Sequence, residues 1–174
     1  LMWLDKAQTW ALAERLGGAV RYRRTDVSSR EQVQALVDYT VAEFGGLHAM
    51  CNNAGLSDNL FGPLLDADLS IFDKIMAVNV MGVILMMREV LPHLRAAGGG
   101  HIINISSGGA IFPGPGPYDA SKVRGGDIFY GPQKSLIEHF SQAEGWRHQA
   151  EGISVNVLSP KGRIKTPGNI MAAN

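Results

Sequence analysis

The sequence predicts an α/β fold with a doubly wound parallel sheet. Apolar segments of strand length alternate with segments of helical periodicity along the chain. The expected strands are continuously apolar rather than alternating, which is typical of a parallel sheet covered on both faces by helices. The chain has 174 residues, and no linker or repeat divides it, so we expect a single domain over residues 1–174.

Stop signals and helix caps set the boundaries of the expected elements. Glycines follow the first three expected helices at 17–18, 45–46 and 98–100, and Ser28 or Ser29 can cap the second helix. The segment 107–129 is rich in Gly and Pro, so we expect a long loop there. In chain order, the expected helices cover 5–16, 30–44, 69–94 and 131–148, and the expected strands cover 19–24, 47–51, 101–105 and 153–158.

Composition excludes several classes of partner. The formal net charge is zero, so we expect no nucleic acid partner and no attraction to an anionic membrane. The longest apolar run, 75–87, is shorter than the roughly 18 residues that span a bilayer. A single cysteine, Cys51, excludes an internal disulfide and fits a cytoplasmic location. The five histidines have no metal-ligand spacing, so no metal site is expected.

Four short motifs occur in order along the chain. They are Asp26-Val27, Asn52-Asn53-Ala54-Gly55, Ile105-Ser106-Ser107 followed by a Tyr-x-x-x-Lys, and the run at 155–160. Each motif is weak alone, but at this spacing they together resemble the short-chain dehydrogenase/reductase family over nearly the whole chain. The resemblance implies a Rossmann-type fold. It also implies hydride transfer between NAD or NADP and a small-molecule carbonyl or secondary alcohol.

A tyrosine followed four residues later by a lysine suits proton transfer at a carbonyl or an alcohol. The pKa of a free tyrosine lies near 10, too high to work well at neutral pH. A lysine on the same helical face favours the tyrosinate and lowers that pKa. A serine can hold the substrate oxygen by a hydrogen bond. The resemblance assigns this role to Ser107 rather than Ser106, has the lysine also bind the nicotinamide ribose, and has Asn79 support a water-linked proton relay.

Two tyrosine–lysine pairs have this spacing. Tyr118 and Lys122 form the closer literal match, but two glycines soon after Lys122 would break a helix. Tyr130 and Lys134 are followed by an uninterrupted amphipathic stretch, and Pro132 is acceptable in the first turn of a helix. We therefore predict that Tyr130 and Lys134 are the catalytic pair. Tyr118 and Lys122 are the alternative pair. If Tyr130 and Lys134 are the catalytic pair, Tyr118 and Lys122 lie in an enlarged loop that borders the active site.

Spacing along the chain also bears on this choice. Lys134 precedes Asn156 by 22 residues, the separation expected in the resembled family. Ser107 precedes Tyr130 by 23 residues, which is longer than usual there. An insertion between Ser107 and the tyrosine would fall in a loop, and loops absorb insertions more readily than packed helices.

The resemblance also assigns residues to the cofactor. Asp26 and Val27 correspond to the pair that contacts the adenine, although Asp26 has a second interpretation as a cap before a helix. The usual Pro-Gly near the nicotinamide is here Pro160-Lys161. The choice between NAD and NADP is not readable, because Trp3 stands where an acidic residue would favour NAD. The expected cofactor-binding residues are Asp26, Val27, Asn53, Ala54, Gly55, Tyr130, Lys134, Pro160 and Thr166.

The resembled family opens with a strand and a Thr-Gly-x-x-x-Gly-x-Gly turn that seats the pyrophosphate, and this turn is absent from the sequence. We therefore expect a partial domain, truncated at both ends, in which the first strand, the glycine-rich turn and the second strand are largely missing. The resemblance implies that a complete protein would form a homo-dimer or homo-tetramer through the helices at 69–94 and 131–148. An alternative is a non-catalytic fragment that serves as a nucleotide-binding or oligomerisation module.

Overall fold

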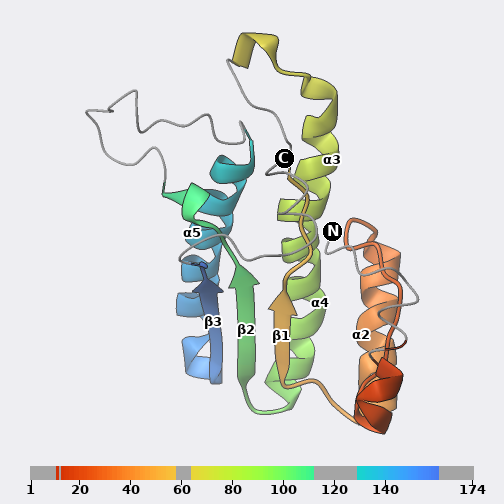
Figure 1. Ribbon diagram of the computed structural model, residues 1–174. Coiled ribbons are helices and arrows are strands. Elements are labelled where there is room, and N and C mark those ends of the chain that lie inside the picture. The colour runs from red at the N-terminus through yellow and green to blue at the C-terminus, as the bar shows by residue number, and fades with distance from the viewer. Residues whose placement is uncertain (1–10, 12, 58–63, 112–128, 161–174) are drawn as a thin grey trace.

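The structure is a computed structural model that describes residues 11, 13–57, 64–111 and 129–160. Three parallel strands form one sheet in the order β1-β2-β3, and helical crossovers join consecutive strands (Figure 1). The expected α/β class with a parallel sheet is confirmed. The strands are β1 (Ala49–Asn52), β2 (Gly100–Ile105) and β3 (Ile153–Leu158).

The main helices agree with the sequence expectations to within two residues. They are α2 (Arg30–Phe44), α4 (Gly82–Ala96) and α5 (Tyr130–His148). The expected helix over 69–94 is one continuous helical stretch made of η3 (Leu69–Ile71), α3 (Phe72–Met76), a π turn η4 (Ala77–Met81) and α4. The remaining short 3₁₀ turns are η1 (Gly17–Ala19), η2 (Leu64–Asp66), η5 (Gly108–Ala110) and η6 (Gln149–Glu151).

Local signals at both ends of α2 act as expected. Of the two candidate caps, Ser29 is the N-cap, and its Oγ accepts a hydrogen bond from the backbone N–H of Gln32 at 3.3 Å. Gly45 ends the helix in the left-handed conformation with φ 76°. This conformation favours glycine because a Cβ would crowd the backbone.

The strand expected over 19–24 does not form. Val20 has extended backbone angles, φ −125° and ψ 137°, but no described strand pairs with it. A strand needs a neighbour for its backbone hydrogen bonds, and the strand that would lie beside this one in a doubly wound sheet is not among the described residues. The expected helix over 5–16 lies mostly outside them, and residues 11 and 13–15 are helical.

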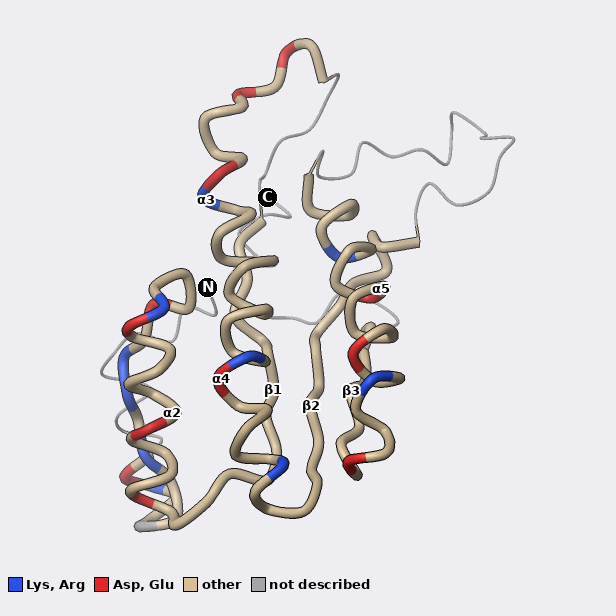
Figure 2. Tube along the Cα trace, turned by 180° about the vertical axis from the view of Figure 1, so that it is seen from behind, with Lys and Arg blue, Asp and Glu red and all other residues tan. Residues whose placement is uncertain are grey.

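Among the described residues, helices cover only one face of the sheet. Figure 1 shows α4 and α5 on the same side of the strands. Met50 and Ile102 face these helices and are buried, whereas their neighbours Cys51 and Ile103 are exposed. The expected cover on both faces is therefore not seen in the described part of the chain. The three strands contain no Lys, Arg, Asp or Glu, and the described residues of these types lie on the helices and the turns between elements (Figure 2).

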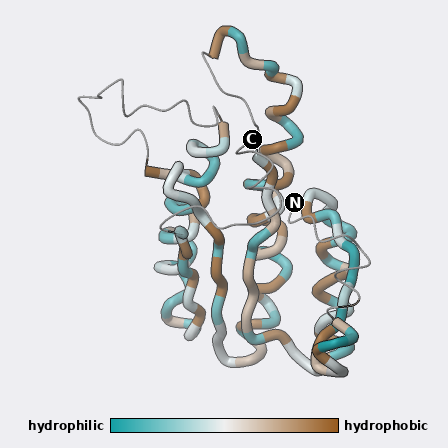
Figure 3. Tube along the Cα trace, viewed as in Figure 1, coloured by the Kyte–Doolittle hydropathy of each residue, from teal (hydrophilic) through white to brown (hydrophobic). Residues whose placement is uncertain are grey.

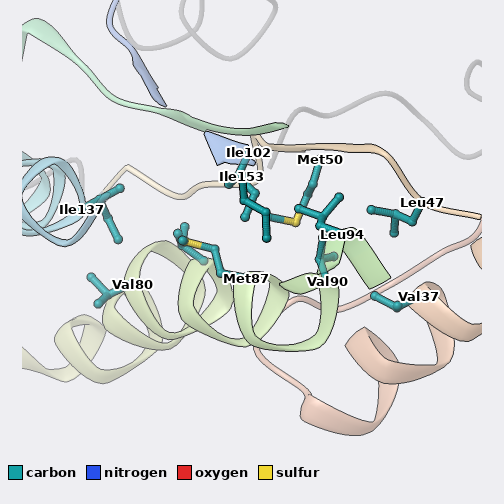
Figure 4. Close-up of a cluster of buried hydrophobic side chains, with 11 residues drawn as sticks. Val37, Leu47, Met50, Val80, Met87, Val90, Leu94, Ile102, Ile137 and Ile153 are labelled. Carbon is teal, nitrogen blue, oxygen red and sulfur yellow. The ribbon is translucent and has the colours of Figure 1, made fainter. Parts of the chain in front are cut away.

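The core lies between the sheet and α4. Met87, Val90 and Leu94 of α4 point toward Met50 and Ile102 of the strands (Figure 4). Burying each such side chain contributes about 1.5–3 kcal/mol. This packing holds the carboxyl ends of β1 and β2 in place beside the helix, and that is the end at which the predicted site residues lie.

The helical stretch Leu69–Ala96 is long and apolar enough, by length and composition alone, to cross a membrane. Figure 3 shows α4 as mostly apolar and α2 as more hydrophilic. The core residues of α4 pack on the sheet, and core helices of globular proteins have this composition too.

Candidate active site

Four segments that carry the predicted site residues meet at the carboxyl end of the sheet. They are the loop after β1, the turn after β2, the π turn η4 and the first turn of α5, linked by the contacts described below. Ligands of open parallel sheets bind at this end, outside the carboxyl ends of the strands. The fold therefore brings together segments that are far apart in the sequence.

Tyr130 and Lys134 lie one helical turn apart at the start of α5. Lys134 is buried, with 6% of its surface exposed, and its Nζ lies 5.4 Å from the centroid of the Tyr130 ring. The same Nζ donates a hydrogen bond to the Ile105 carbonyl oxygen at 2.7 Å, which fixes the ammonium at the end of β2. Burial lowers the pKa of Lys134, because desolvation disfavours the charged form.

The two adjacent serines after β2 have different surroundings. Ser106 is buried, and its hydroxyl donates to the Glu138 carboxylate of α5 at 2.5 Å. Ser107 is only partly buried, and its Oγ accepts a hydrogen bond from the Gly109 backbone N–H at 3.2 Å. Ser106 thus has a partner within the fold. The Ser107 hydroxyl is the acceptor in its bond, so its own proton is available for a further hydrogen bond.

A close backbone approach holds the Ser107 turn against α5. A Cβ added at Gly131 would lie 2.7 Å from the Gly109 carbonyl oxygen, so only glycine fits beside that turn. The Ser135 hydroxyl adds a hydrogen bond to the Ala110 carbonyl oxygen. Sequence reasoning missed this role of Gly131, and the glycine directly after a helix-opening tyrosine is the signal that could have found it.

Asn79 lies in the π turn and has 1% of its surface exposed. Its Oδ1 accepts a hydrogen bond from the Leu56 N–H at 2.7 Å, and its Nδ2 donates to the Leu56 carbonyl oxygen at 2.7 Å. The Nδ2 also donates to Gln133 Oε1 at 2.8 Å. Asn79 therefore ties the long helix both to the loop after β1 and to α5, next to Lys134.

A second buried polar chain lies beneath the ends of the strands. Asn52 Nδ2 donates to Asn104 Oδ1, and Asn104 Nδ2 donates to Ser141 Oγ, each at 2.8 Å. Ser141 in turn donates to the Ile137 carbonyl oxygen at 2.6 Å. The chain joins β1, β2 and α5, so it fixes the position of α5 relative to the loop that follows Asn52. Sequence reasoning did not identify it.

Asp26 and Val27 have clear local partners. The Asp26 carboxylate accepts hydrogen bonds from the Ser28 backbone N–H at 2.9 Å and from the Ser28 hydroxyl at 2.6 Å. These bonds lower the pKa of Asp26 because they stabilise the carboxylate. This geometry is that of a turn before α2, the second interpretation of Asp26 from the sequence. Val27 packs on Gly82, where an added Cβ would lie 2.9 Å from Val27 Cγ2.

Some of the remaining predicted residues are described by the structure, and others lie outside the described ranges. Asn53 and Ala54 are exposed in the loop after β1, while Gly55 is partly buried and faces Asn79 Oδ1. Pro160 is the last described residue. Thr166, Tyr118 and Lys122 lie outside the described residues. Within the described ranges, no cluster of three or more His, Cys, Asp or Glu residues could hold a metal ion.

The fold and the motifs have counterparts in known proteins. A short-chain dehydrogenase/reductase from Burkholderia xenovorans has a similar structure, with a TM-score of 0.80 and 25% identity, covering 95% of this chain and 62% of that chain. A family model described as enoyl-(acyl carrier protein) reductase matches residues 3–173. The chain belongs to the short-chain dehydrogenase/reductase family. The resemblance drawn from the sequence motifs is confirmed.

Two other members of the short-chain dehydrogenase/reductase family are also similar. The chain is 37% identical to the 3-alpha-(or 20-beta)-hydroxysteroid dehydrogenase of Mycobacterium bovis over 159 residues, which cover 90% of the chain. The 3-ketoacyl-(acyl-carrier-protein) reductase of Brucella melitensis, solved with NADH, has a TM-score of 0.77 and 28% identity, covering 90% of this chain and 62% of that chain. The chain spans about half the length of the relatives it matches, 55% for the hydroxysteroid dehydrogenase.

The donors at this end of the sheet fit the nicotinamide ribose. The Lys134 ammonium has three N–H groups, and one of them donates to Ile105. The other two have no acceptor among the described residues, so the chemistry of this ammonium suits hydroxyl oxygens such as those of a ribose. Asn53, Ala54 and Gly55 follow β1 directly at the same end of the sheet. The pyrophosphate-binding turn of the family has no counterpart in this sequence.

Proposed function

We propose that the full-length protein containing this chain transfers a hydride between NAD or NADP and a carbonyl or secondary alcohol. The single observation that supports this most strongly is the pair at the start of α5, where a buried lysine lies 5.4 Å from the ring centroid of Tyr130. Similar relatives are named dehydrogenases and reductases, and similar solved structures hold NADH or NADP.

Tyr130 is the proposed acid and base. In reduction its hydroxyl donates a proton to the substrate oxygen, and in oxidation the tyrosinate accepts a proton from the alcohol. The positive charge of Lys134 favours the tyrosinate and lowers the pKa of Tyr130. The bond from Lys134 to the Ile105 carbonyl oxygen holds the ammonium in place for this effect. The bound nicotinamide supplies or accepts the hydride.

Ser107 and Asn79 are proposed to assist this proton transfer. The Ser107 hydroxyl donates a hydrogen bond to the substrate oxygen and holds it near Tyr130. Asn79 supports the water-linked relay that exchanges the proton with solvent, and its three hydrogen bonds keep it in one position. Because these groups come from the π turn, the turn after β2 and α5, the site forms only when those elements pack together.

The proposed cofactor contacts come from several loops. Asn53, Ala54 and Gly55 approach the ribose from the end of β1, while Tyr130 and Lys134 approach it from α5. Asp26 and Val27 at the adenine, and Pro160 and Thr166 at the nicotinamide, stay predictions. Both hydrogen bonds from Ser28 go to Oδ1 of Asp26, so Oδ2 is the oxygen that such a contact would use.

A transfer experiment in the full-length protein tests the function. The protein is incubated with NADH or NADPH deuterated at the nicotinamide C4 position and with a set of ketones that includes a steroid ketone, since a similar relative is a hydroxysteroid dehydrogenase. We expect deuterium on the carbinol carbon of the alcohol product. Binding of NAD(P)H without deuterium transfer to any ketone would favour the alternative of a non-catalytic nucleotide-binding module.

Assembly and location are further predictions. We expect a homo-dimer or homo-tetramer that uses α4 and α5, since Met81, directly before α4, and Leu136 on α5 are exposed apolar residues of these helical stretches. Sedimentation of the full-length protein measures this directly, and a monomer at micromolar concentration would contradict it. A cytoplasmic location and the absence of nucleic acid and membrane partners also stay predictions from composition.

A further inference from the structure

Gln133 is a buried amide in the first turn of α5, directly before Lys134. Only 3% of its surface is exposed, and its Oε1 accepts a hydrogen bond from Asn79 Nδ2 at 2.8 Å. The Leu56 N–H donates to Asn79 Oδ1, so the other amide atom of Asn79 must be the donor nitrogen. The atom of Gln133 that faces Asn79 is therefore its oxygen, and the nitrogen Nε2 is turned elsewhere.

Nε2 of Gln133 is buried without a hydrogen-bond partner among the described residues. Buried donors are nearly always paired, and exceptions occur where a group has a catalytic role or bonds to water. An apolar side chain of the same volume would avoid the cost of burying this donor. The hydrogen bond from Asn79 accounts for Oε1 of this glutamine but not for its buried donor Nε2.

We propose that Gln133 is a positioning residue for the proton relay, an inference that rests on the function proposed above. Its Oε1 holds Asn79 in the π turn, and its Nε2 offers a donor to the water-linked relay that Asn79 supports. Gln133 would thus link Asn79 to the water of the relay. It lies between Tyr130 and Lys134 on α5, and its hydrogen bond with Asn79 connects α5 to the long helix.

The first test replaces the amide by an apolar side chain of similar length, Gln133→Met, in the full-length protein. We expect kcat to fall about 10- to 100-fold, because a misplaced relay group slows proton transfer. KM should stay within about twofold, because the residue touches neither substrate nor cofactor. Gln142→Met is the matched control, since Gln142 is exposed on the same helix, and it should keep the parent kcat.

A double-mutant cycle shows whether Gln133 acts through Asn79. If it does, Gln133→Met should lower kcat no further in a protein that already carries Asn79→Ala. A parent-like kcat in Gln133→Met, or losses that multiply in the double variant, would overturn the proposal. If Gln133→Met fails to fold, Gln133→Asn replaces it, since its amide ends one carbon short of Asn79. The same fall in kcat is expected, and a parent-like kcat overturns the proposal.

Tyr130→Phe is assayed in parallel to separate this inference from the function on which it rests. If Tyr130→Phe keeps the parent turnover, the proposed function fails. If Tyr130→Phe is inactive while Gln133→Met is as active as the parent, only the positioning role of Gln133 fails.

Discussion

At the scale of single residues, the burial of Lys134 sets up the proposed chemistry. The ammonium is held between the Tyr130 ring and the Ile105 carbonyl oxygen, away from bulk water. Desolvation disfavours its charge and lowers its pKa, while the charge itself is what Tyr130 needs. The proposed chemistry therefore requires Lys134 to stay protonated at a buried position, where burial of its charge lowers the stability of the folded protein.

The lowered pKa of Lys134 predicts a pH dependence of stability. Between the lowered value and the ordinary lysine pKa of about 10.4, the unfolded chain binds a proton that the folded chain does not. The free energy of unfolding should therefore rise with pH across that window, and Lys134→Met should lack this rise. Urea unfolding of both cofactor-free full-length proteins, from about pH 7 to about pH 10, measures the difference. Parallel curves for the two proteins would contradict the prediction.

The neighbouring serines predict a separation between activity and stability. Ser107→Ala removes the donor to the substrate oxygen and should lower kcat about 100-fold with little change in stability. Ser106→Ala leaves the Glu138 carboxylate without its buried donor and should cost about 1.5–3 kcal/mol, with kcat kept within about twofold. Steady-state kinetics and urea unfolding of both variants check this. The reverse pattern would show that the roles of the serines are exchanged.

At the scale of elements, glycines set how closely segments approach. Gly82 begins α4 beside the loop that carries Val27, and Gly131, the second residue of α5, lies beside the Ser107 turn. Each glycine lies where a Cβ would meet another segment at less than 3.0 Å. The π turn η4 also shapes the site, and π turns inside α-helices are frequent at functional sites. It presents Asn79 toward Leu56 and Gln133.

Gly82→Ala tests the contact between α4 and the loop before α2. In an ordinary helix, alanine is more stable than glycine by about 0.5–1 kcal/mol. Here the added Cβ would lie 2.9 Å from Val27 Cγ2 and 3.3 Å from the Val27 carbonyl oxygen. We therefore expect a loss of about 1–3 kcal/mol in the free energy of unfolding.

The control for this variant is Gly108→Ala, where an added Cβ meets nothing within 4 Å. It should change the free energy of unfolding by about 0.5 kcal/mol or less. In the double variant with Val27→Ala, the loss should be smaller than the sum of the single losses, because the crowded methyl group is removed. A more stable Gly82→Ala protein would show that the loop does not pack on α4.

At the scale of the whole molecule, the described sheet has three strands with helices on one face. Cys51 and Ile103 lie on the other face and are exposed. Parallel sheets occur with both faces covered, so this face is where further parts of a full-length relative would pack. The chain spans about half the length of the relatives that it matches. The proposed site lies at the carboxyl edge of these strands.

Local sequence signals predicted most of this arrangement. The periodicity of 30–44 and 131–148 and the glycine stops gave helices within a residue or two, because capping and amphipathicity act within a few residues. The strand predicted over 19–24 does not form, because strand pairing depends on a neighbouring strand and not only on the sequence of the segment itself. The choice of helix start at Tyr130 was correct for the same local reasons.

The motifs predicted which residues form the candidate site, but not the hydrogen bonds that connect them. The motifs named Ser107, Asn79 and the Tyr130–Lys134 pair. Partners such as Gln133 depend on how α5 crosses the long helix, and no local pattern encodes that crossing. The buried polar chain from Asn52 through Asn104 to Ser141 was missed for this reason. Glycines at close approaches were missed because their neighbours are distant in the sequence.

Tyr130, and not Tyr118, is the residue proposed to transfer the proton. The most direct measurement compares turnover of the full-length protein with that of Tyr130→Phe and Tyr118→Phe, using the ketone and cofactor that show deuterium transfer. We predict that Tyr130→Phe lowers kcat at least about 100-fold while Tyr118→Phe stays within about threefold of the parent. Loss of turnover in Tyr118→Phe with parent-like turnover in Tyr130→Phe would contradict the account.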